Sequence, residues 1–211
     1  MPKSSFKFKQ FTIFHDKCAM KVGTDGVLLG AWAPADKAKR ILDVGTGTGL
    51  IALQLAQRNP HARITAIEID AAAAGQATEN VSHSPWADRV EIICHDFRDY
   101  QPENRFDLIV SNPPYIPSEV IRGLEPEVRD HEPLGALDGK EDGLYFYRIL
   151  AEQCGDFLNQ GGSVYFETGH DQGAAVKTLL ESHGFQDTKV IKDLAGMDRV
   201  VRGTWPGQIR K

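Results

Sequence analysis

From residue 39 onward, the chain alternates two kinds of hydrophobic segment. Short runs rich in Ile and Val predict β-strands over residues 39–44, 63–69, 90–94, 106–110, 163–167, 189–193 and 199–204. Longer stretches rich in Leu, Ala and Gln predict helices over residues 50–58, 71–81, 143–158 and 171–183. Such alternation is typical of an α/β fold, so we expect a doubly wound, mostly parallel, seven-stranded sheet. Its last two strands should form an antiparallel hairpin at one edge.

Two segments stand outside this alternation. Residues 1–38 are predicted to be a separate N-terminal basic segment, and residues 39–211 to be the α/β domain. The first 40 residues carry eight basic and three acidic side chains, a net charge of +5. Residues 116–143 carry three basic and eight acidic side chains, a net charge of −5. This loop, rich in Pro, Gly and acid, is too long for a plain connector, which indicates function.

Composition restricts the class of protein. The chain has 211 residues, a net charge of −5, 41% hydrophobic and 25% charged residues, which is typical of one globular domain. No apolar run is long enough to cross a membrane, and we expect neither a membrane partner nor a signal peptide. Cys18, Cys94 and Cys154 are odd in number and widely spaced, so we expect no disulfide framework, no metal site and a cytoplasmic location. We also expect a monomer.

The junction between the first strand and the first helix contains an acid, three glycines and a threonine: Asp43, Gly45, Thr46, Gly47 and Gly49. Glycines at a strand-to-helix turn let the backbone approach a ligand closely. Their spacing differs from the G-x-G-x-x-G of dinucleotide sites, and an acid at the start of the turn suits a cationic ligand better than a pyrophosphate. A plain tight turn is the alternative.

Further acids follow the next two strands. Glu68 ends the second strand, nineteen positions after Gly49, where a carboxylate would accept both ribose hydroxyls; we include its neighbour Ile69 in the site. Asp96 ends the third strand, where it would accept from an adenine amine, with Phe97 packing on the ring. The alternatives are a solvated strand end for Glu68 and a helix N-cap for Asp96. Together with the glycine turn, these residues predict S-adenosylmethionine (AdoMet) as cofactor and S-adenosylhomocysteine as product.

The fourth strand leads into Asn112, Pro113, Pro114 and Tyr115. A planar NH2 nitrogen is a poor nucleophile because its lone pair is delocalised. The Asn112 side-chain oxygen and the Pro113 carbonyl would accept both N–H donors and hold the lone pair toward a methyl donor, while Tyr115 stacks on the flat group. Asn112 would thus border cofactor and substrate alike. An Asn-Pro-Pro turn beside a core tyrosine is the alternative.

The first half of the chain resembles the bacterial tRNA adenine-N6 methyltransferases that modify valine tRNA next to the anticodon. The resemblance rests on FKQF (8–11), HDKCAMKVGTDG (15–26), LLGAW (28–32) and SPWA (84–87), and runs to Tyr115. It implies a Rossmann-like class I methyltransferase fold. It also implies that Lys21, Thr24 and Asp25 contact AdoMet.

From Asn112 onward, the chain resembles the HemK/PrmC release-factor glutamine methyltransferases. This resemblance rests on NPPYIPS (112–118), EPEVRDHEP (125–133), ALDG (136–139), EDGL (141–144), DQG (171–173) and KDLAG (192–196). The chain therefore has a composite appearance, joined at or near the NPPY tetrad. The helical N-terminal domain of the release-factor enzymes has no counterpart in the short basic segment before the first core strand.

We expect an AdoMet-dependent N-methyltransferase acting on adenine N6 of a tRNA. Residues 39–211 would be its AdoMet-dependent methyltransferase domain, and the basic segment of residues 1–38 would contribute to the cofactor and substrate site. N5-methylation of the glutamine of a peptide chain release factor is the first alternative, and an AdoMet-binding composite without an efficient substrate is the second. A nicotinamide oxidoreductase is a further alternative, for which we find no hydride-transfer residue. Lysines alternating with phenylalanines between Lys3 and Lys21 would grip RNA, or would form a two-faced strand with its aromatic side chains inward.

Overall fold

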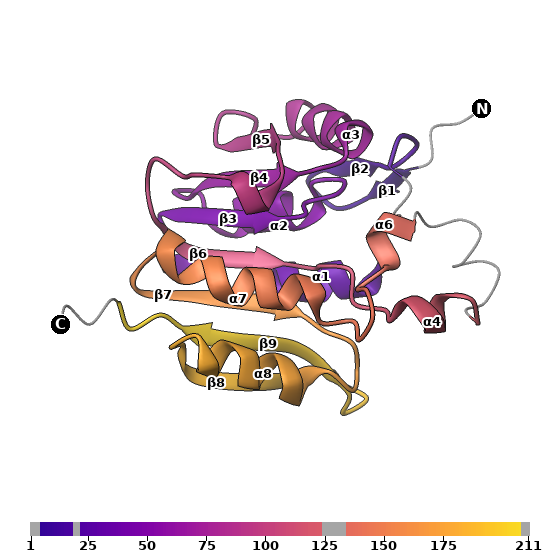
Figure 1. The fold of residues 1–211 in the computed structure, drawn as a ribbon. Helices are drawn as coiled ribbons and strands as arrows, with labels where there is room; N and C mark the ends of the chain where they lie inside the picture. The colour runs from indigo at the N-terminus through magenta and orange to yellow at the C-terminus, as the bar shows by residue number, and fades with distance from the viewer. Residues whose placement is uncertain (1–4, 19–21, 124–133, 208–211) are drawn as a thin grey trace. The chain divides into compact units, whose positions relative to one another are not determined.

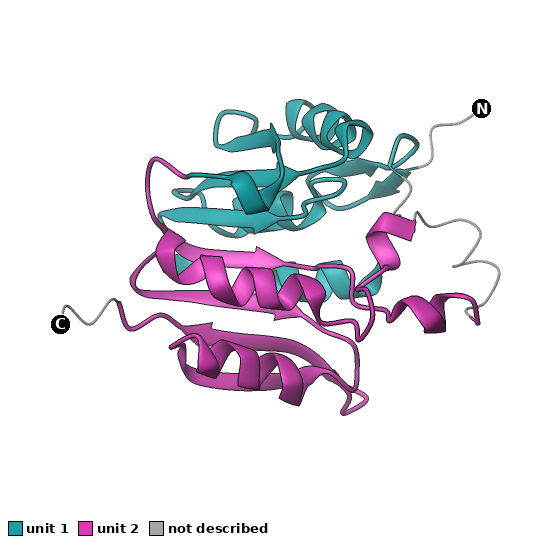
Figure 2. Ribbon diagram, viewed as in Figure 1, with its two compact units in different colours: residues 1–101 teal, residues 102–211 magenta. Residues whose placement is uncertain are grey.

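A computed structural model describes residues 5–18, 22–123 and 134–207. The chain divides into two compact units, residues 1–101 and 102–211 (Figure 2). Each unit combines strands of the main sheet with helices (Figure 1). The expected Lys21 contact, Lys3 and the EPEVRDHEP motif lie outside the described residues.

The first unit contains a small hairpin and three parallel strands of the main sheet. Its helices are α1 (Thr24–Trp32), η1 (Ala35–Lys37), α2 (Leu50–Arg58), α3 (Ala71–Ser82) and η2 (Phe97–Asp99). Its strands are β1 (Ser5–Lys7), β2 (Thr12–Phe14), β3 (Arg40–Val44), β4 (Arg63–Glu68) and β5 (Val90–Cys94). The parallel strands lie in the order β5-β4-β3 and are in register at their carboxyl ends, with Val44 opposite Ile67 and Glu68 opposite Cys94. The residues that follow these strands therefore share one edge of the sheet.

The second unit contributes four strands in the order β6-β7-β9-β8. Its strands are β6 (Phe106–Ser111), β7 (Leu158–Glu167), β8 (Gln186–Lys192) and β9 (Asp198–Thr204). Its helices are α4 (Ser118–Ile121), α6 (Leu134–Leu137), α7 (Tyr145–Phe157) and α8 (Gly173–Ser182). β6 and β7 are parallel, whereas β7–β9 and β9–β8 are antiparallel. The predicted mostly parallel seven-stranded fold with an antiparallel hairpin at one edge is confirmed.

Strand β7 begins five residues earlier than its sequence predicts, at Leu158 instead of Ser163. Gly161 and Gly162 interrupt the hydrophobic run, and glycine is disfavoured inside strands. Backbone hydrogen bonds compensate, because Gly161 N–H donates to the Trp205 carbonyl (2.8 Å) and Trp205 N–H donates to Gly162 (2.7 Å). Gly161 also has a φ of +80°, which a glycine adopts without strain.

Helix α1 is absent from the elements expected from the sequence. Gly26 and Gly30 lower its helix propensity by about 1 kcal/mol each relative to Ala. Glycine is needed at these positions because α1 packs closely against α2: a Cβ at Gly30 would lie 2.2 Å from Gln54 Oε1. Arg58 on α2 also donates hydrogen bonds to the carbonyls of Gly30 (2.9 Å) and Ala33 (2.6 Å). Close contact between two helices thus outweighs local propensity.

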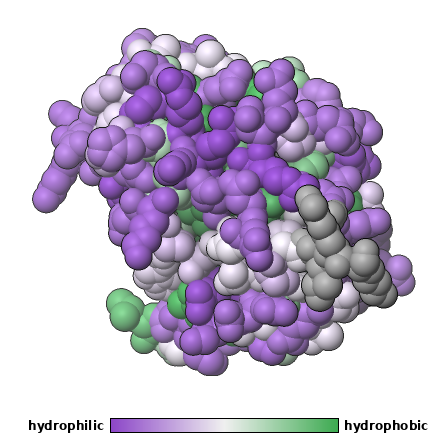
Figure 3. Space-filling model, turned by 90° about the vertical axis from the view of Figure 1, so that its left-hand side faces the viewer, coloured by the Kyte–Doolittle hydropathy of each residue, from purple (hydrophilic) through white to green (hydrophobic). Residues whose placement is uncertain are grey.

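The face of the molecule drawn in Figure 3 is predominantly hydrophilic. Within the described part of the chain, no helix is both long and apolar enough to span a bilayer. Among the described residues, no group of three His, Cys, Asp or Glu side chains has the arrangement of a metal site. None of the three cysteines, all of them described, forms a disulfide, and Cys18 and Cys154 are buried.

Candidate functional site

The turn between β3 and α2 has a backbone shape that depends on its glycines. Gly45, Gly47 and Gly49 have φ angles of +71°, +57° and +82°, which residues with a Cβ rarely adopt. A Cβ built at Gly45 or Gly47 would meet no heavy atom within 4 Å. Open space therefore borders this main chain, and a ligand can approach it directly.

Asp43, near the end of β3, is a fully buried acid. Its Oδ2 accepts hydrogen bonds from the Thr46 hydroxyl (2.6 Å) and the Ala52 N–H (3.1 Å). Its Oδ1 is buried without a hydrogen-bond partner among the described residues. Burial raises the pKa of Asp43 to about 7, although the two hydrogen bonds oppose the shift. A cationic ligand nearby would favour the ionised form of this carboxyl.

Glu68 links the end of β4 to the glycine turn. Its Oε2 accepts from Gly47 N–H (2.8 Å) and its Oε1 from Asp70 N–H (3.0 Å). Each carboxylate oxygen has two lone pairs, so both can also accept from ligand hydroxyls. The next residue, Ile69, leaves 63% of its surface exposed at the same strand end. A buried acceptor beside an exposed apolar side chain fits a sugar attached to an aromatic ring.

Asp96 has the helix-capping role that the sequence left open as an alternative. Its carboxylate accepts from the Arg98 N–H (2.9 Å) at the start of η2 and is ion-paired with the Arg98 guanidinium. The side-chain hydrogen bond from Arg98 lowers the pKa of Asp96 below its ordinary value. The neighbouring Phe97 is only 8% exposed and belongs to the core. The cofactor roles of both residues stay predictions.

Thr24 and Asp25 form the first turn of α1. Gly26, one residue later, lies against the first turn of α2, since its Cβ would approach Leu50 Cδ2 to 3.3 Å. The contacts then advance along both helices in the same direction, from Gly26 with Leu50 to Gly30 with Gln54. The two helices are therefore parallel, and Thr24 and Asp25 lie at the end of α1 nearest the glycine turn.

In the second unit, the NPPY tetrad directly follows β6. Ser111 is buried, Pro113 is buried, and Asn112 and Tyr115 are half-buried. Within the described residues, neither the Asn112 side chain nor the Pro113 carbonyl takes part in a hydrogen bond. Both acceptors that the sequence assigns to a planar amine are thus without a competing partner in this part of the chain.

The backbone after the tetrad is held by Gln172, which precedes α8. Gln172 Nε2 donates to the Tyr115 carbonyl at 2.8 Å, and its Oε1 accepts from Gly169 N–H at 3.1 Å. A further pair of backbone hydrogen bonds fixes Ile116, whose N–H donates to Leu137 (3.0 Å) and whose carbonyl accepts from Gly139 (2.8 Å). Hydrogen bonds therefore hold the backbone at the end of the tetrad, at Tyr115 and Ile116, in place.

Three glycines make room for this arrangement. A Cβ at Gly139 would lie 2.8 Å from Tyr115 Cα, and one at Gly143 would lie 2.3 Å from the Tyr115 carbonyl oxygen. A Cβ at Gly169 would lie 2.9 Å from Gln172 Oε1. We call Gln172 and these three glycines the tyrosine cradle, because together they enclose the main chain of Tyr115.

Comparison with known proteins identifies the family. Residues 18–122 match the family described as Methyltransferase small domain. A tRNA1(Val) (adenine(37)-N6)-methyltransferase of Bacteroides thetaiotaomicron is 67% identical over 191 residues, which cover 90% of this chain and 76% of that protein. This chain belongs to the family of the tRNA1(Val) (adenine(37)-N6)-methyltransferases. A member from Salmonella enteritidis is 48% identical over 171 residues, which cover 75% of this chain and 69% of its own length.

A solved structure supports the fold of this methyltransferase family member. An RNA methyltransferase from Salinibacter ruber in complex with S-adenosylhomocysteine matches with a TM-score of 0.58 and 19% identity. The match covers 91% of this chain and 97% of that one. At this identity the likeness concerns the fold alone.

Within each unit, the methyltransferase fold gathers the residues that the sequence singles out. The glycine turn, Glu68, Ile69 and Asp96 share the carboxyl edge of β3, β4 and β5 in the first unit. The tetrad occupies the corresponding end of β6 in the second unit. The cofactor and catalytic roles of these residues are taken up below as proposals.

Two supporting residues carry no signal of their role in the sequence. Gln172 contacts Tyr115 across 57 positions, and although it is part of the DQG motif, that motif indicates no contact. Asn80 on α3 is buried, accepts from Phe14 N–H (2.9 Å), and donates to the carbonyls of Phe14 (2.8 Å) and Thr48 (2.9 Å). Only the tertiary fold brings these partners together.

Proposed function

We propose that this protein is an AdoMet-dependent N-methyltransferase that methylates N6 of an adenine in tRNA. The observation that carries the proposal is the pair of uncommitted acceptors, Asn112 and the Pro113 carbonyl, at the end of β6. Its named relatives act on adenine 37 of tRNA1(Val), which supports adenine rather than another planar amine. We extend the same substrate to this chain.

The first unit fits the cofactor. When bound, AdoMet supplies an electrophilic methyl group on a sulfonium. We assign the ribose hydroxyls to Glu68 and the adenine ring to Ile69, Asp96 and Phe97. Asp43, Gly45, Thr46, Gly47 and Gly49 are assigned to the rest of the cofactor, with Lys21, Thr24 and Asp25 completing the set. Support comes from the open space beside Gly45 and Gly47 and from the unpartnered Asp43 Oδ1.

The tetrad prepares the nucleophile. The Asn112 side-chain oxygen and the Pro113 carbonyl each accept one N–H of the adenine amine, which turns its lone pair out of conjugation. The rings of Pro113 and Pro114 keep the acceptor carbonyl in place, and Tyr115 stacks on the base. A strong base is unnecessary before attack, because the amine becomes acidic only after alkylation and its proton then leaves to water.

Release-factor glutamine is the alternative substrate. It rests on the motifs of the second half, which resemble the release-factor methyltransferases. The Bacteroides alignment covers 90% of the chain and so extends well past Tyr115, which favours tRNA. A composite that binds AdoMet without an efficient substrate is the second alternative. The basic segment of residues 1–38, a monomeric state and a cytoplasmic location remain part of the proposal.

Methyl transfer distinguishes these substrates directly. Tritiated AdoMet is offered separately to undermodified valine tRNA and to an unmethylated release factor. We expect label in the tRNA, at N6 of adenine. Asn112→Ala should lower the rate at least about 100-fold, because one amine acceptor is lost, while calorimetry finds AdoMet affinity unchanged. Asn104→Ala, an exposed asparagine two residues before β6, is the control and should retain full activity.

Three results would contradict the proposal in different ways. Label in the release factor alone would establish the alternative substrate. Label in neither would favour the inactive composite, provided that AdoMet still binds. An Asn112→Ala protein that loses AdoMet affinity together with activity would make Asn112 a structural residue.

A further inference from the structure

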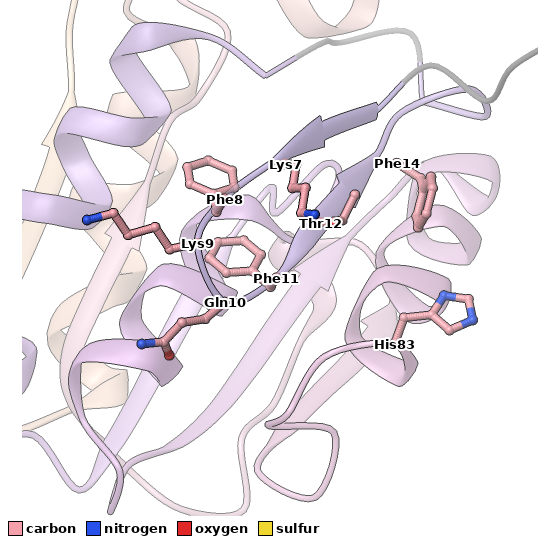
Figure 4. Close-up of a pocket in the computed structure, with 8 residues that line it drawn as sticks. All are labelled: Lys7, Phe8, Lys9, Gln10, Phe11, Thr12, Phe14 and His83. Atoms are coloured by element: carbon pink, nitrogen blue, oxygen red, sulfur yellow. The ribbon is translucent and has the colours of Figure 1, made fainter.

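The N-terminal hairpin bears a cavity of about 380 Å³ that the proposed chemistry does not use. It is lined by Lys7, Phe8, Lys9, Gln10, Phe11, Thr12, Phe14 and His83 (Figure 4). Its volume falls within the range of small-ligand sites, about 300–1,000 Å³. All but one of the lining residues belong to the β1–β2 hairpin and its turn, and His83 follows α3.

Aromatic rings form the apolar part of the cavity. Phe8 and Phe11 stack with centroids 4.5 Å apart and planes 7° apart, and Trp86 packs edge-on against Phe11 at 5.5 Å. Phe14 and His83 form a second pair, 6.1 Å apart at 71° (Figure 4). Phe11 is buried, whereas Phe8 and Phe14 are half-buried. The hairpin therefore offers partly open aromatic surface, which is what an unpaired base needs for stacking.

The charged side chains around the cavity are basic. Lys7, Lys9 and His83 are exposed, and the lining residues include no acid. Among the described residues neither Lys7 nor Lys9 forms an ion pair, in contrast to Lys17, which pairs with Glu79 at 2.6 Å. Two uncompensated ammonium groups beside aromatic rings suit a ligand that combines a flat ring with phosphates.

The hairpin is fixed to the element that supports the glycine turn. Asn80 on α3 joins both backbone groups of Phe14 to the Thr48 carbonyl. Gln76, also on α3, accepts from Lys17 N–H at 3.0 Å. A ligand held in the cavity is therefore held at a defined place on the first unit.

The geometry points to a binding site for an unpaired nucleotide of the substrate RNA other than the methylated adenine. Its base packs against Phe8 and Phe14, with Phe11 supporting Phe8 from beneath, and its flanking phosphates contact Lys7 and Lys9. This assignment rests on the proposed function, since it supplies that reaction with an RNA-binding surface. An RNA supplies both a flat base for the aromatic rings and phosphates for the two lysines, whereas an unmodified peptide carries no phosphate.

Binding of the anticodon stem-loop of valine tRNA, followed by fluorescence anisotropy across a salt series, tests the assignment. Lys7→Gln/Lys9→Gln should weaken binding and flatten the slope of log K against log salt by about 1.4, at about 0.7 per lost phosphate contact. Phe8→Leu should weaken binding about fivefold or more at every salt concentration without changing the slope. Lys37→Gln/Lys189→Gln removes two exposed lysines outside the cavity and should behave as wild type.

The outcomes test the nucleotide site in the cavity separately from the proposed methylation of tRNA. AdoMet affinity and thermal stability are measured for every variant, so that a folding defect is recognised. If the wild type methylates the RNA and the cavity variants bind the RNA normally, the nucleotide site in the cavity is wrong and the proposed function stands. Wild-type protein that binds AdoMet but neither binds nor methylates the stem-loop overturns the proposed function and this assignment with it. Cavity variants that impair release-factor methylation instead would assign the surface to a protein and overturn the RNA site.

Discussion

Asp43 and Glu68 are acids that the first unit buries close to one another. Glu68 is bonded through both oxygens to backbone N–H groups, at Gly47 and Asp70. Asp43 is less well satisfied, because only its Oδ2 accepts hydrogen bonds within the described residues. A buried carboxyl without full compensation destabilises the fold when it ionises. Its place beside the glycine turn fits the proposed role in binding AdoMet better than a role in stability.

Asp43 should make the protein less stable as the pH rises. Its pKa is raised from 3.8 to about 7, chiefly by burial. Between those values the unfolded chain loses the proton while the folded protein keeps it, so stability falls with increasing pH and levels off above about pH 7. Relative to Asp43→Asn, whose amide oxygen can still accept from Thr46 and Ala52, the wild type should lose on the order of 3 kcal/mol between pH 5 and pH 8.

Urea unfolding at pH 5, 6, 7 and 8 measures this loss. Asp88→Asn, which removes an exposed carboxyl, is the control and should follow the wild-type curve. Parallel curves for wild type and Asp43→Asn would show that Asp43 is already ionised in the folded protein at pH 5.

At the scale of elements, the tyrosine cradle joins three parts of the second unit to the end of β6. Gly139 follows α6, Gly143 precedes α7, and Gln172 precedes α8. The Tyr115 carbonyl receives its hydrogen bond from the Gln172 side chain rather than from a strand or helix. The backbone next to Asn112 and Pro113, the proposed amine acceptors, is therefore held by residues that lie 24 to 57 positions after Tyr115.

Gln172→Ala should slow methyl transfer about tenfold or more, because the backbone next to Pro113 and Pro114 loses its hydrogen bond and small misplacements of reacting groups are costly. Gln172→Glu keeps an acceptor for Gly169 N–H but offers no donor to Tyr115, so it should show a similar loss of kcat. Single-turnover kinetics measures the rate of methyl transfer, and calorimetry on the same variants measures their affinity for AdoMet. Gln186→Ala, at an exposed position on β8, is the matched control. A kcat within twofold of wild type for both Gln172 variants would exclude a positioning role.

Much of this organisation follows from local sequence. The expected limits of α2 and β5 agree with the structure at both ends, since Leu, Ala and Gln favour helices and Val and Ile favour strands. Helix α1 and the start of β7 were missed because glycines at 26, 30, 161 and 162 serve tertiary packing and hydrogen bonding. Candidate ligand-binding residues could be found at strand ends, whereas Gln172 and Asn80 could not, since their function depends on partners distant in sequence.

For the whole molecule, net charge says little about RNA binding. Residues 1–111 carry 13 basic and 13 acidic side chains, and residues 112–211 carry 11 and 16. We therefore expect attraction to phosphates to come from local clusters such as Lys7 and Lys9, because exposed charges farther apart than about 10 Å are screened at 0.1 M salt. The salt dependence of RNA binding should accordingly reflect a few contacts rather than the whole surface.

Cofactor choice is also a property of the whole folded protein, because a ligand that binds only the native state raises its melting temperature. At 100 times its Kd, AdoMet should add about 2.7 kcal/mol to the free energy of unfolding. For a chain of this size that corresponds to a rise of about 5–11 °C. NAD at the same concentration should leave the melting temperature unchanged, because the buried acid Asp43 lies just before the glycine turn and disfavours a pyrophosphate there. A larger rise in melting temperature with NAD than with AdoMet would instead indicate a dinucleotide site at the carboxyl edge of β3, β4 and β5. It would contradict AdoMet as the cofactor.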